Sequence, residues 1–157
     1  MKRHQALIPL SHHHHHGLFL ALKLKNAREA KGRWTIEDIY EDAKLFWENG
    51  GEDHFREEEE VLFPELAKYK PIEECPEVKE ALIEHVKIRA LFSQLINDEI
   101  AKTDLEAHMH QLGDCLNQHI RREERLIFPL IEQTIPDGTL QTVAHHFHSY
   151  EDIYTDS

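Results

Sequence analysis

Helical periodicity is the feature that most constrains the fold of this chain. Apolar residues recur every three or four positions along most of its length, and no segment alternates apolar and polar residues as a half-buried strand would. Four long amphipathic segments follow one another with short connections. Because such helices bury their apolar stripes against one another, the pattern predicts an all-α fold, an antiparallel four-helix bundle with a short C-terminal helix.

Capping and breaking residues mark where the helices begin and end. Thr35 to Asp38 and Thr103 to Glu106 each have a hydroxyl followed three residues later by an acidic side chain, the pattern of a capping box. Two consecutive glycines after Asn49 predict a kink within the second helix. We therefore expect five helices: from near Ser11 to a break at Lys31 and Gly32, from Thr35, from about Glu77, from Thr103, and a short one over residues 139–150.

Length and charge narrow the classes of protein to which the chain can belong. With 157 residues it is expected to form one domain, with a bundle core over about residues 8–132 and a C-terminal extension over residues 133–157. The net charge of −12 disfavours binding to nucleic acid or to an anionic membrane. No apolar stretch approaches the ~20 residues of a membrane-spanning helix, and we expect no secretory signal. The two cysteines do not form a disulfide framework, so a cytoplasmic protein is expected.

Two segments repeat the same arrangement of polar residues. Residues 54–64 read His-Phe-Arg-Glu-Glu-Glu-Glu-Val-Leu-Phe-Pro, and residues 119–129 read His-Ile-Arg-Arg-Glu-Glu-Arg-Leu-Ile-Phe-Pro. Residues four apart lie on one face of a helix, so His54 with Glu58, and His119 with Glu123, can each converge on one cation. Two such pairs on facing helices supply two nitrogens and two carboxylates able to bridge, a set suited to paired iron or manganese ions.

A single His-x-x-x-Glu pair is more often a surface ion pair than a metal site. Here the rest of the same face is apolar, at Leu62, Leu116 and Ile127, and burying uncompensated carboxylates there would be costly. The repetition and the apolar surroundings favour the metal site. The neighbouring acids are expected mostly on a solvated face, and the proline six residues after each motif Glu is expected to end or kink its helix (Glu57, Glu59, Glu60, Glu124, Pro64 and Pro129).

The first and third helices are expected to complete the ligand set, since two helices alone would leave each metal under-ligated. On the third, His85 lies on an apolar stripe, where a histidine satisfied by hydrogen bonds is the alternative interpretation. The first contains a run of five histidines, from His12 to His16, which also resembles a purification tag. Steps of four from Leu10 through Leu18 and Leu22 place His14 on the core stripe, with His15 as the second choice.

Together these motifs resemble the hemerythrin/HHE cation-binding family. The resemblance rests on the following segments, in the family's order: Leu10-Ser-x-x-His14, His54-Phe-x-x-Glu58-Glu with Leu62-Phe-Pro64, His85 with Arg89, and His119-x-x-x-Glu123-Glu with Phe128-Pro129. It implies a four-helix bundle with a non-haem di-iron centre in which manganese or zinc could replace iron. The implied ligands are His14, His54, Glu58, His85, His119 and Glu123, with both carboxylates bridging.

One departure from the family bears on function. Classical hemerythrin oxygen carriers have a further His one turn after the third-helix ligand, where this chain has Arg89. Related domains with fewer His ligands include proteins of iron-sulfur cluster repair and sensors of iron or oxygen. The resemblance implies a non-catalytic di-iron protein that binds or senses dioxygen, nitric oxide or peroxide. A redox enzyme of the peroxidase or oxidase type, an iron donor for cluster repair and an iron store are the alternatives, and the sequence indicates no protein partner.

Overall fold

A computed structural model describes residues 2–28 and 33–147, which are helical apart from turns and short connections and contain no strand. The first bundle helix is α1 (Ile8–Lys25), and the third is α5 (Pro76–Ile96). The second is built from α2 (Ile36–Phe46), α3 (Glu52–Glu57) and α4 (Phe63–Ala67), and the fourth from α6 (Leu105–Arg122) and α7 (Phe128–Thr134). The short α8 (Asp137–Ala144) follows.

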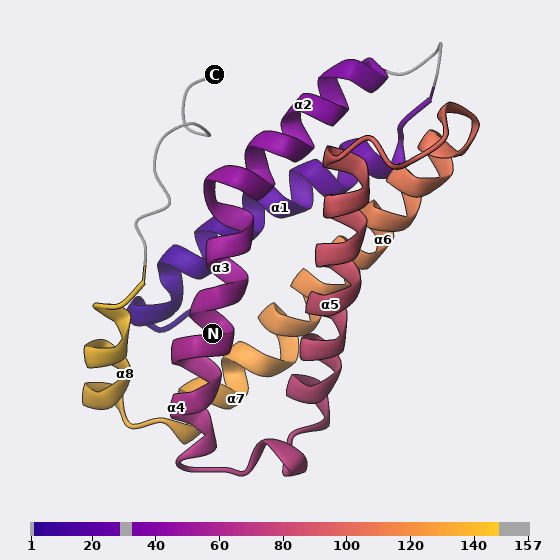
Figure 1. Cartoon of the computed structure of the whole chain (residues 1–157). Helices are drawn as coiled ribbons and strands as arrows, with labels where there is room; N and C mark the ends of the chain where they lie inside the picture. Colours follow the sequence, from indigo (N-terminus) through magenta and orange to yellow (C-terminus); the bar gives the residue numbers. More distant parts are fainter. Residues whose placement is uncertain (1, 29–32, 148–157) are drawn as a thin grey trace.

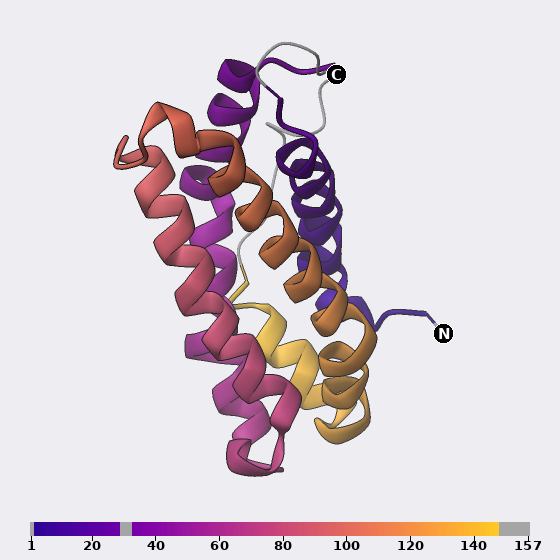
Figure 2. The same ribbon diagram turned by 90° about the vertical axis from the view of Figure 1, so that its right-hand side faces the viewer.

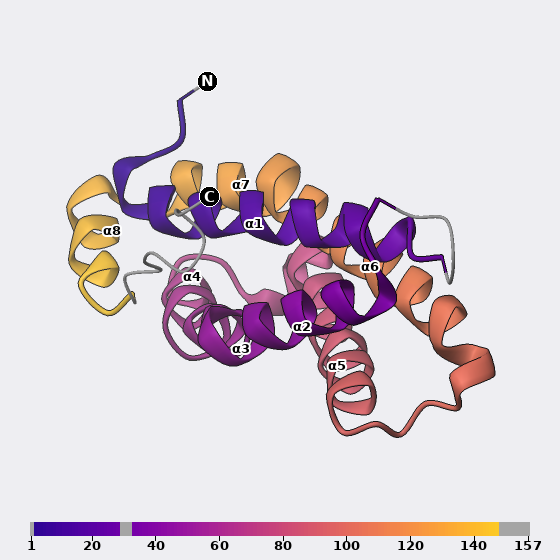
Figure 3. The same ribbon diagram turned by 90° about the horizontal axis from the view of Figure 1, so that it is seen from above.

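The four bundle helices run alternately up and down (Figures 1 and 2). Figure 3, seen from above, shows α1 beside the fourth bundle helix and α2 between α1 and α5. Each helix thus has two neighbours, and its apolar stripe faces the centre. The predicted antiparallel bundle with a short C-terminal helix is confirmed. In the part of the chain that the structure describes, no helix combines the length and apolar character needed to cross a bilayer.

The helix ends agree with the predictions in part. Thr35 forms the predicted capping box, since its hydroxyl accepts from Asp38 N at 3.0 Å and its own N–H donates to the Asp38 carboxylate at 3.4 Å. The box predicted at Thr103 is wrong: the chain enters α6 through a 3-10 turn (Lys102–Asp104), and the side chain of Asp104 makes no capping hydrogen bond. The helix α1 already ends at Lys25, and the predicted break at Lys31 and Gly32 lies outside the described residues.

The second bundle helix is kinked at its glycines, as predicted. A π-helical turn, η2 (Trp47–Gly51), joins α2 to α3, and Gly50 leaves helical geometry with φ 173° and ψ −30°. The kink redirects the chain immediately before His54, so it sets how the first His-x-x-x-Glu motif meets the bundle axis. No side chain fits at Gly51, where a Cβ atom would lie 2.9 Å from the Trp47 ring.

The helices are also distorted at each of the two motif glutamates. The π-helical turns η3 (Glu58–Leu62) and η6 (Glu123–Ile127) start at the two glutamates, and each ends just before a Phe-Pro pair. The N–H of Phe63 bonds to the Glu58 carbonyl, five residues back, and Phe128 repeats this with Glu123. Because each proline then lies at the start of a new α segment, where a missing N–H is tolerated, both helices continue. Such turns are frequent at functional sites.

Two apolar clusters fill the bundle, one on each side of a buried polar layer. The first cluster includes Leu24, Phe46, Phe92, Leu112 and Ile120, and the second includes Leu10, Leu62, Leu66, Phe128 and Ile131. Along each bundle helix the polar residues fall between members of the two clusters, as His85 does between Ala81 and Ile88. The layer is therefore shielded from water at both ends by packed hydrocarbon.

The candidate metal centre

The structure brings all six residues predicted as ligands into this buried layer. They form two groups of four that share two carboxylates: His14, His54, Glu58 and Glu123 in the first group, and His85, His119, Glu58 and Glu123 in the second. Within each group, one ligand atom from every residue lies within 4.8 Å of the others. All six are at most 4% exposed. Each group could hold a metal ion.

Of the two candidates on α1, His14 lies in the buried layer. It is buried, whereas His15 is exposed. Leu22, placed on the core stripe by counting in fours, is 52% exposed, because a helix turns every 3.6 residues and steps of four drift around it. Leu20, Ala21 and Leu24 carry the stripe instead.

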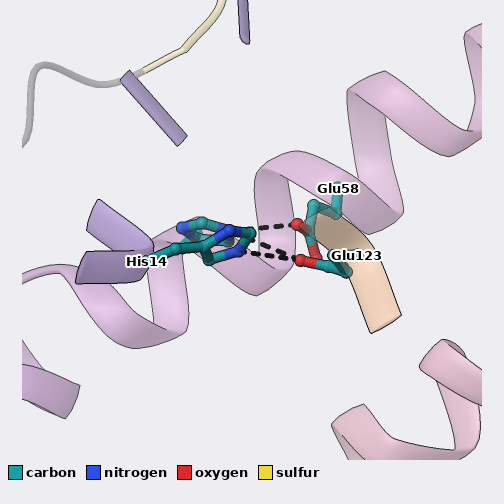
Figure 4. Close-up of side chains that lie close together, drawn as sticks. His14, Glu58 and Glu123 are labelled. Atoms are coloured by element: carbon teal, nitrogen blue, oxygen red, sulfur yellow. Dashed lines mark hydrogen bonds and ion pairs between the residues drawn. The ribbon is translucent and has the colours of Figure 1, made fainter. Parts of the chain in front are cut away.

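Each of the four histidines presents its Nε2 atom to a different carboxylate oxygen. In the first group, His14 lies 2.9 Å from Glu123 Oε1, and His54 lies 2.9 Å from Glu58 Oε2. In the second, His85 lies 3.0 Å from Glu58 Oε1, and His119 lies 3.4 Å from Glu123 Oε2. Figure 4 shows His14 facing the two carboxylates. Each glutamate therefore divides its two oxygens between the groups, as a carboxylate that bridges two ions does.

Several atoms of this layer have the environment of metal ligands. Glu58 Oε1, Glu123 Oε2, His85 Nε2 and His119 Nε2 are buried and have no hydrogen-bond partner among the described residues. Leaving a buried polar atom unpaired costs about 1–3 kcal/mol, so native proteins rarely do so. His85 Nε2 and Glu58 Oε1 are close but not aligned for a hydrogen bond. Lone pairs directed into a shared space are what a cation requires, so the donor set fits a metal ion.

The charges of the layer are also compatible with a cation site. Burial, together with the charge of Glu123, raises the pKa of Glu58 well above its usual range. Burial opposes ionisation of Glu123 as well, but the charge of His119 and hydrogen bonds with the surrounding groups hold its pKa well below the usual range. Burial likewise disfavours charged His119, yet Glu123 and Glu84 raise its pKa to about 9. A divalent cation between the two glutamates would favour ionisation of both, because it supplies positive charge beside Glu58.

Three of the four histidines have a carboxylate on their other ring nitrogen. Glu124 lies 2.6 Å from His14 Nδ1, and Glu59 lies 2.6 Å from His85 Nδ1. Glu84 lies 2.9 Å from His119 Nδ1. A carboxylate in this position fixes the tautomer and the orientation of a ligating imidazole and makes it a stronger donor. This role was not predicted from the sequence, although the Glu-Glu doublet in each repeat was a visible signal for Glu59 and Glu124, whereas Glu84 lies outside both repeats.

The expected solvated face is therefore wrong for part of the acidic run. Glu59 and Glu124 are less than one-third exposed and contact candidate ligand histidines, and Glu57 is buried. Glu60 is exposed and pairs with Arg56, four residues earlier. The helix phase explains the difference, because Glu59 and Glu124 follow Glu58 and Glu123 by 100° and so reach the neighbouring helix.

Arg89 occupies the position at which oxygen carriers of the resembling family have a further histidine. Its guanidinium pairs with Glu59 at 2.9 Å and with Glu52 at 3.3 Å, and it lies over the rings of Trp47 and Phe55. A guanidinium is not a metal ligand. Arg89 instead fixes the carboxylate that holds His85, so it acts on the site through Glu59.

His54 differs from the other three histidines, because its Nδ1 faces another imidazole. His13 Nδ1 lies 3.0 Å from His54 Nδ1, and the His13 ring stacks on Phe46 at a centroid distance of 4.8 Å. Burial, with the charges of His14, His16 and His12, lowers the pKa of His13 to about 3. A cavity of about 10 Å³, roughly one water molecule in size, is lined by His13, three of the candidate ligands and apolar side chains.

Four further histidines that the structure describes are explained by other contacts or by exposure. His108 hydrogen-bonds to the backbone carbonyl of Leu91 at 2.8 Å and so links α6 to α5. His110 hydrogen-bonds to the backbone carbonyl of Ala27 at 2.8 Å and so links α6 to the connection after α1. His145 and His146 are exposed beyond α8. His148, which the sequence places in the same cluster, lies outside the described residues.

The fold and the buried layer define a helical-bundle protein with a His and Glu cation site. The family model of the hemerythrin HHE cation binding domain matches residues 6–131, and a second match covers residues 78–153. The chain belongs to this family, and binding of a cation follows from that membership. Comparisons with curated proteins and with solved structures gave no significant match.

Proposed function

We propose that the chain holds two iron ions, bridged by Glu58 and Glu123, and uses them to bind or sense dioxygen or a related small ligand such as nitric oxide or peroxide. The division of four carboxylate oxygens between two pairs of histidines carries this proposal. His14 and His54 would hold one ion, and the histidines of α5 and α6 the other. Imidazole with carboxylate suits iron, with manganese and zinc as possible substitutes.

The residues around the centre support binding of a small ligand. Iron held by these residues would, in its reduced state, supply reactivity towards dioxygen and related small molecules. The cavity beside His14, His54 and His119 is otherwise lined by apolar side chains, and it admits about one water-sized molecule. Such a site excludes bulky substrates and keeps bulk water from the ions.

The number of protein ligands for each ion supports exchange of small ligands more than formation of a protected, reversible adduct. Each ion would receive two histidines and one oxygen from each bridging glutamate, since Arg89 replaces a further histidine. Open positions favour ligand exchange and redox chemistry. A redox enzyme is therefore the second candidate function.

The test first measures metal content and then follows the reaction of the reduced protein with oxygen. Protein made without an added tag should contain close to two metal ions per chain, and zero or one would contradict the dinuclear proposal. The anaerobic ferrous protein is then exposed to oxygen while its visible spectrum is followed. A stable coloured adduct supports carriage, and rapid conversion to a ferric state supports sensing or redox turnover. No spectral change would contradict binding of oxygen and leave iron storage.

A further inference from the structure

The two candidate metal positions receive the same atoms but different support. Each has two histidine Nε2 atoms and one oxygen from each of Glu58 and Glu123. Both histidines of the second group have a carboxylate on Nδ1, whereas in the first group only His14 has one. His54 has the imidazole of His13 there. The asymmetry therefore lies outside the ligands themselves.

A cation on His54 Nε2 would decide which ring carries the proton between His13 and His54. His54 directs Nε2 towards Glu58 at 2.9 Å and towards Glu123 at 3.9 Å, so this atom faces the candidate metal position. A neutral imidazole that gives its Nε2 lone pair to a cation has its hydrogen on Nδ1. Because the two Nδ1 atoms are 3.0 Å apart, metal-bound His54 would then donate and His13 would accept.

The surroundings hold His13 in this role. It is 1% exposed, and its ring lies within 7° of parallel to Phe46, while α1 fixes its backbone one residue before His14. A stacked and enclosed ring has few alternative rotamers, so the acceptor nitrogen stays aimed at His54.

We propose that His13 is a positioning residue that selects the Nε2-binding tautomer of His54 and, being an imidazole in the place where the other histidines have a carboxylate, leaves the His14/His54 position the weaker of the two metal positions. This inference rests on the proposed dinuclear centre. A carboxylate partner strengthens an imidazole ligand, and removal of such partners typically lowers metal affinity by about 10–100-fold. The His14/His54 position, where only His14 has a carboxylate on Nδ1, is accordingly the last to bind metal and the first to lose it.

Zinc titration of the metal-free protein against a competing chelator tests the proposal. The wild type should bind two ions in two resolved steps. His13→Glu supplies a carboxylate and should tighten the weaker step by about tenfold, so that the two steps approach each other. His13→Leu removes the acceptor and should weaken the same step by about 10–100-fold. His15→Gln, an exposed change within the same histidine run, is the matched control and should alter neither step.

Nitrogen-15 spectra of the histidines in the zinc-loaded protein give a second readout. The Nδ1–H signal of His54 should be present in the wild type and should shift in both His13 variants, while that of His85 stays in place. If His13→Leu fails to fold, the His13→Glu result decides alone. Unchanged affinities, or a change in the tighter step, would overturn the inference and leave the dinuclear centre standing. Fewer than two zinc ions in the wild type would instead refute the proposed function, and this inference with it.

Discussion

Replacing Glu59 by glutamine should reveal how strongly the carboxylates behind the ligands contribute to metal binding. Glu59 accepts from His85 Nδ1 at 2.6 Å and from Arg89 at 2.9 Å. Burial opposes its ionisation, but these two partners lower its pKa, so it is charged at neutral pH. An amide keeps the size of the side chain and removes the charge. The change therefore tests electrostatic support with little effect on packing.

The magnitude follows from the two contacts that the amide weakens. A hydrogen bond to a charged group contributes about 1.5–3 kcal/mol. The ion pair with Arg89 adds at most ~1 kcal/mol, because both side chains are about 30% exposed and solvent screens them. An amide oxygen still accepts a neutral hydrogen bond, so part of the first contribution remains. We expect a loss of about 1.4–2.7 kcal/mol in binding of the ion held by His85, which is 10–100-fold in affinity.

Competition with a chelator measures this loss of metal affinity, and the adjacent residue Glu60 offers a matched control. Glu60→Gln removes the same charge one residue later from an exposed side chain paired with Arg56, and it should change neither metal affinity nor stoichiometry. Glu124→Gln should act on the ion held by His14 as Glu59→Gln does on the other. If Glu59→Gln and Glu60→Gln behave alike, then the carboxylate does not support His85 and the reasoning is wrong.

Three further changes test other parts of the structure. Glu58→Gln should reduce metal content well below two ions per chain by elemental analysis, yet it should not destabilise the metal-free protein, because burial raises the pKa of Glu58 and already favours an uncharged side chain of this size there. Gly113→Ala should lower the free energy of unfolding in urea by about 1–3 kcal/mol, since the new Cβ would lie 2.9 Å from Ala21 O, whereas Gly138→Ala meets nothing within 4 Å and should be neutral. Arg89→His should slow oxidation of the diferrous protein in stopped-flow measurements, because it offers a further nitrogen one turn after His85.

The sequence predicted the bundle and its kink for local reasons. Apolar periodicity and the glycines at 50 and 51 act within one helix, so they can be read without knowledge of the neighbours. The box at Thr103 failed because the chain closes a 3-10 turn there, with Asp104 N bonded to Ala101 O at 2.8 Å. Competition between two local hydrogen-bonding patterns is not decided by residue types alone.

The candidate ligands could be predicted for the same local reason, but the carboxylates that support them could not. His-x-x-x-Glu is a contact between residues of one helix, and its repetition was visible. The contacts of Glu59 with His85 and of Glu124 with His14 join different helices. They depend on how each helix is rotated about its axis, which packing determines. Within the run of five histidines, the same rotation decides that His14 faces the carboxylates while His15 faces solvent.

These contacts between helices couple metal binding to assembly of the bundle. Glu59 on the second bundle helix holds His85 on the third, and Glu124 on the fourth holds His14 on the first. Glu58 and Glu123 are likewise shared between both groups. Neither the first two helices nor the last two therefore contain a complete candidate metal position, and its residues meet only when all four helices have packed. A cation that neutralises the two buried glutamates consequently stabilises the whole bundle, because its ligands exist together only in the folded state.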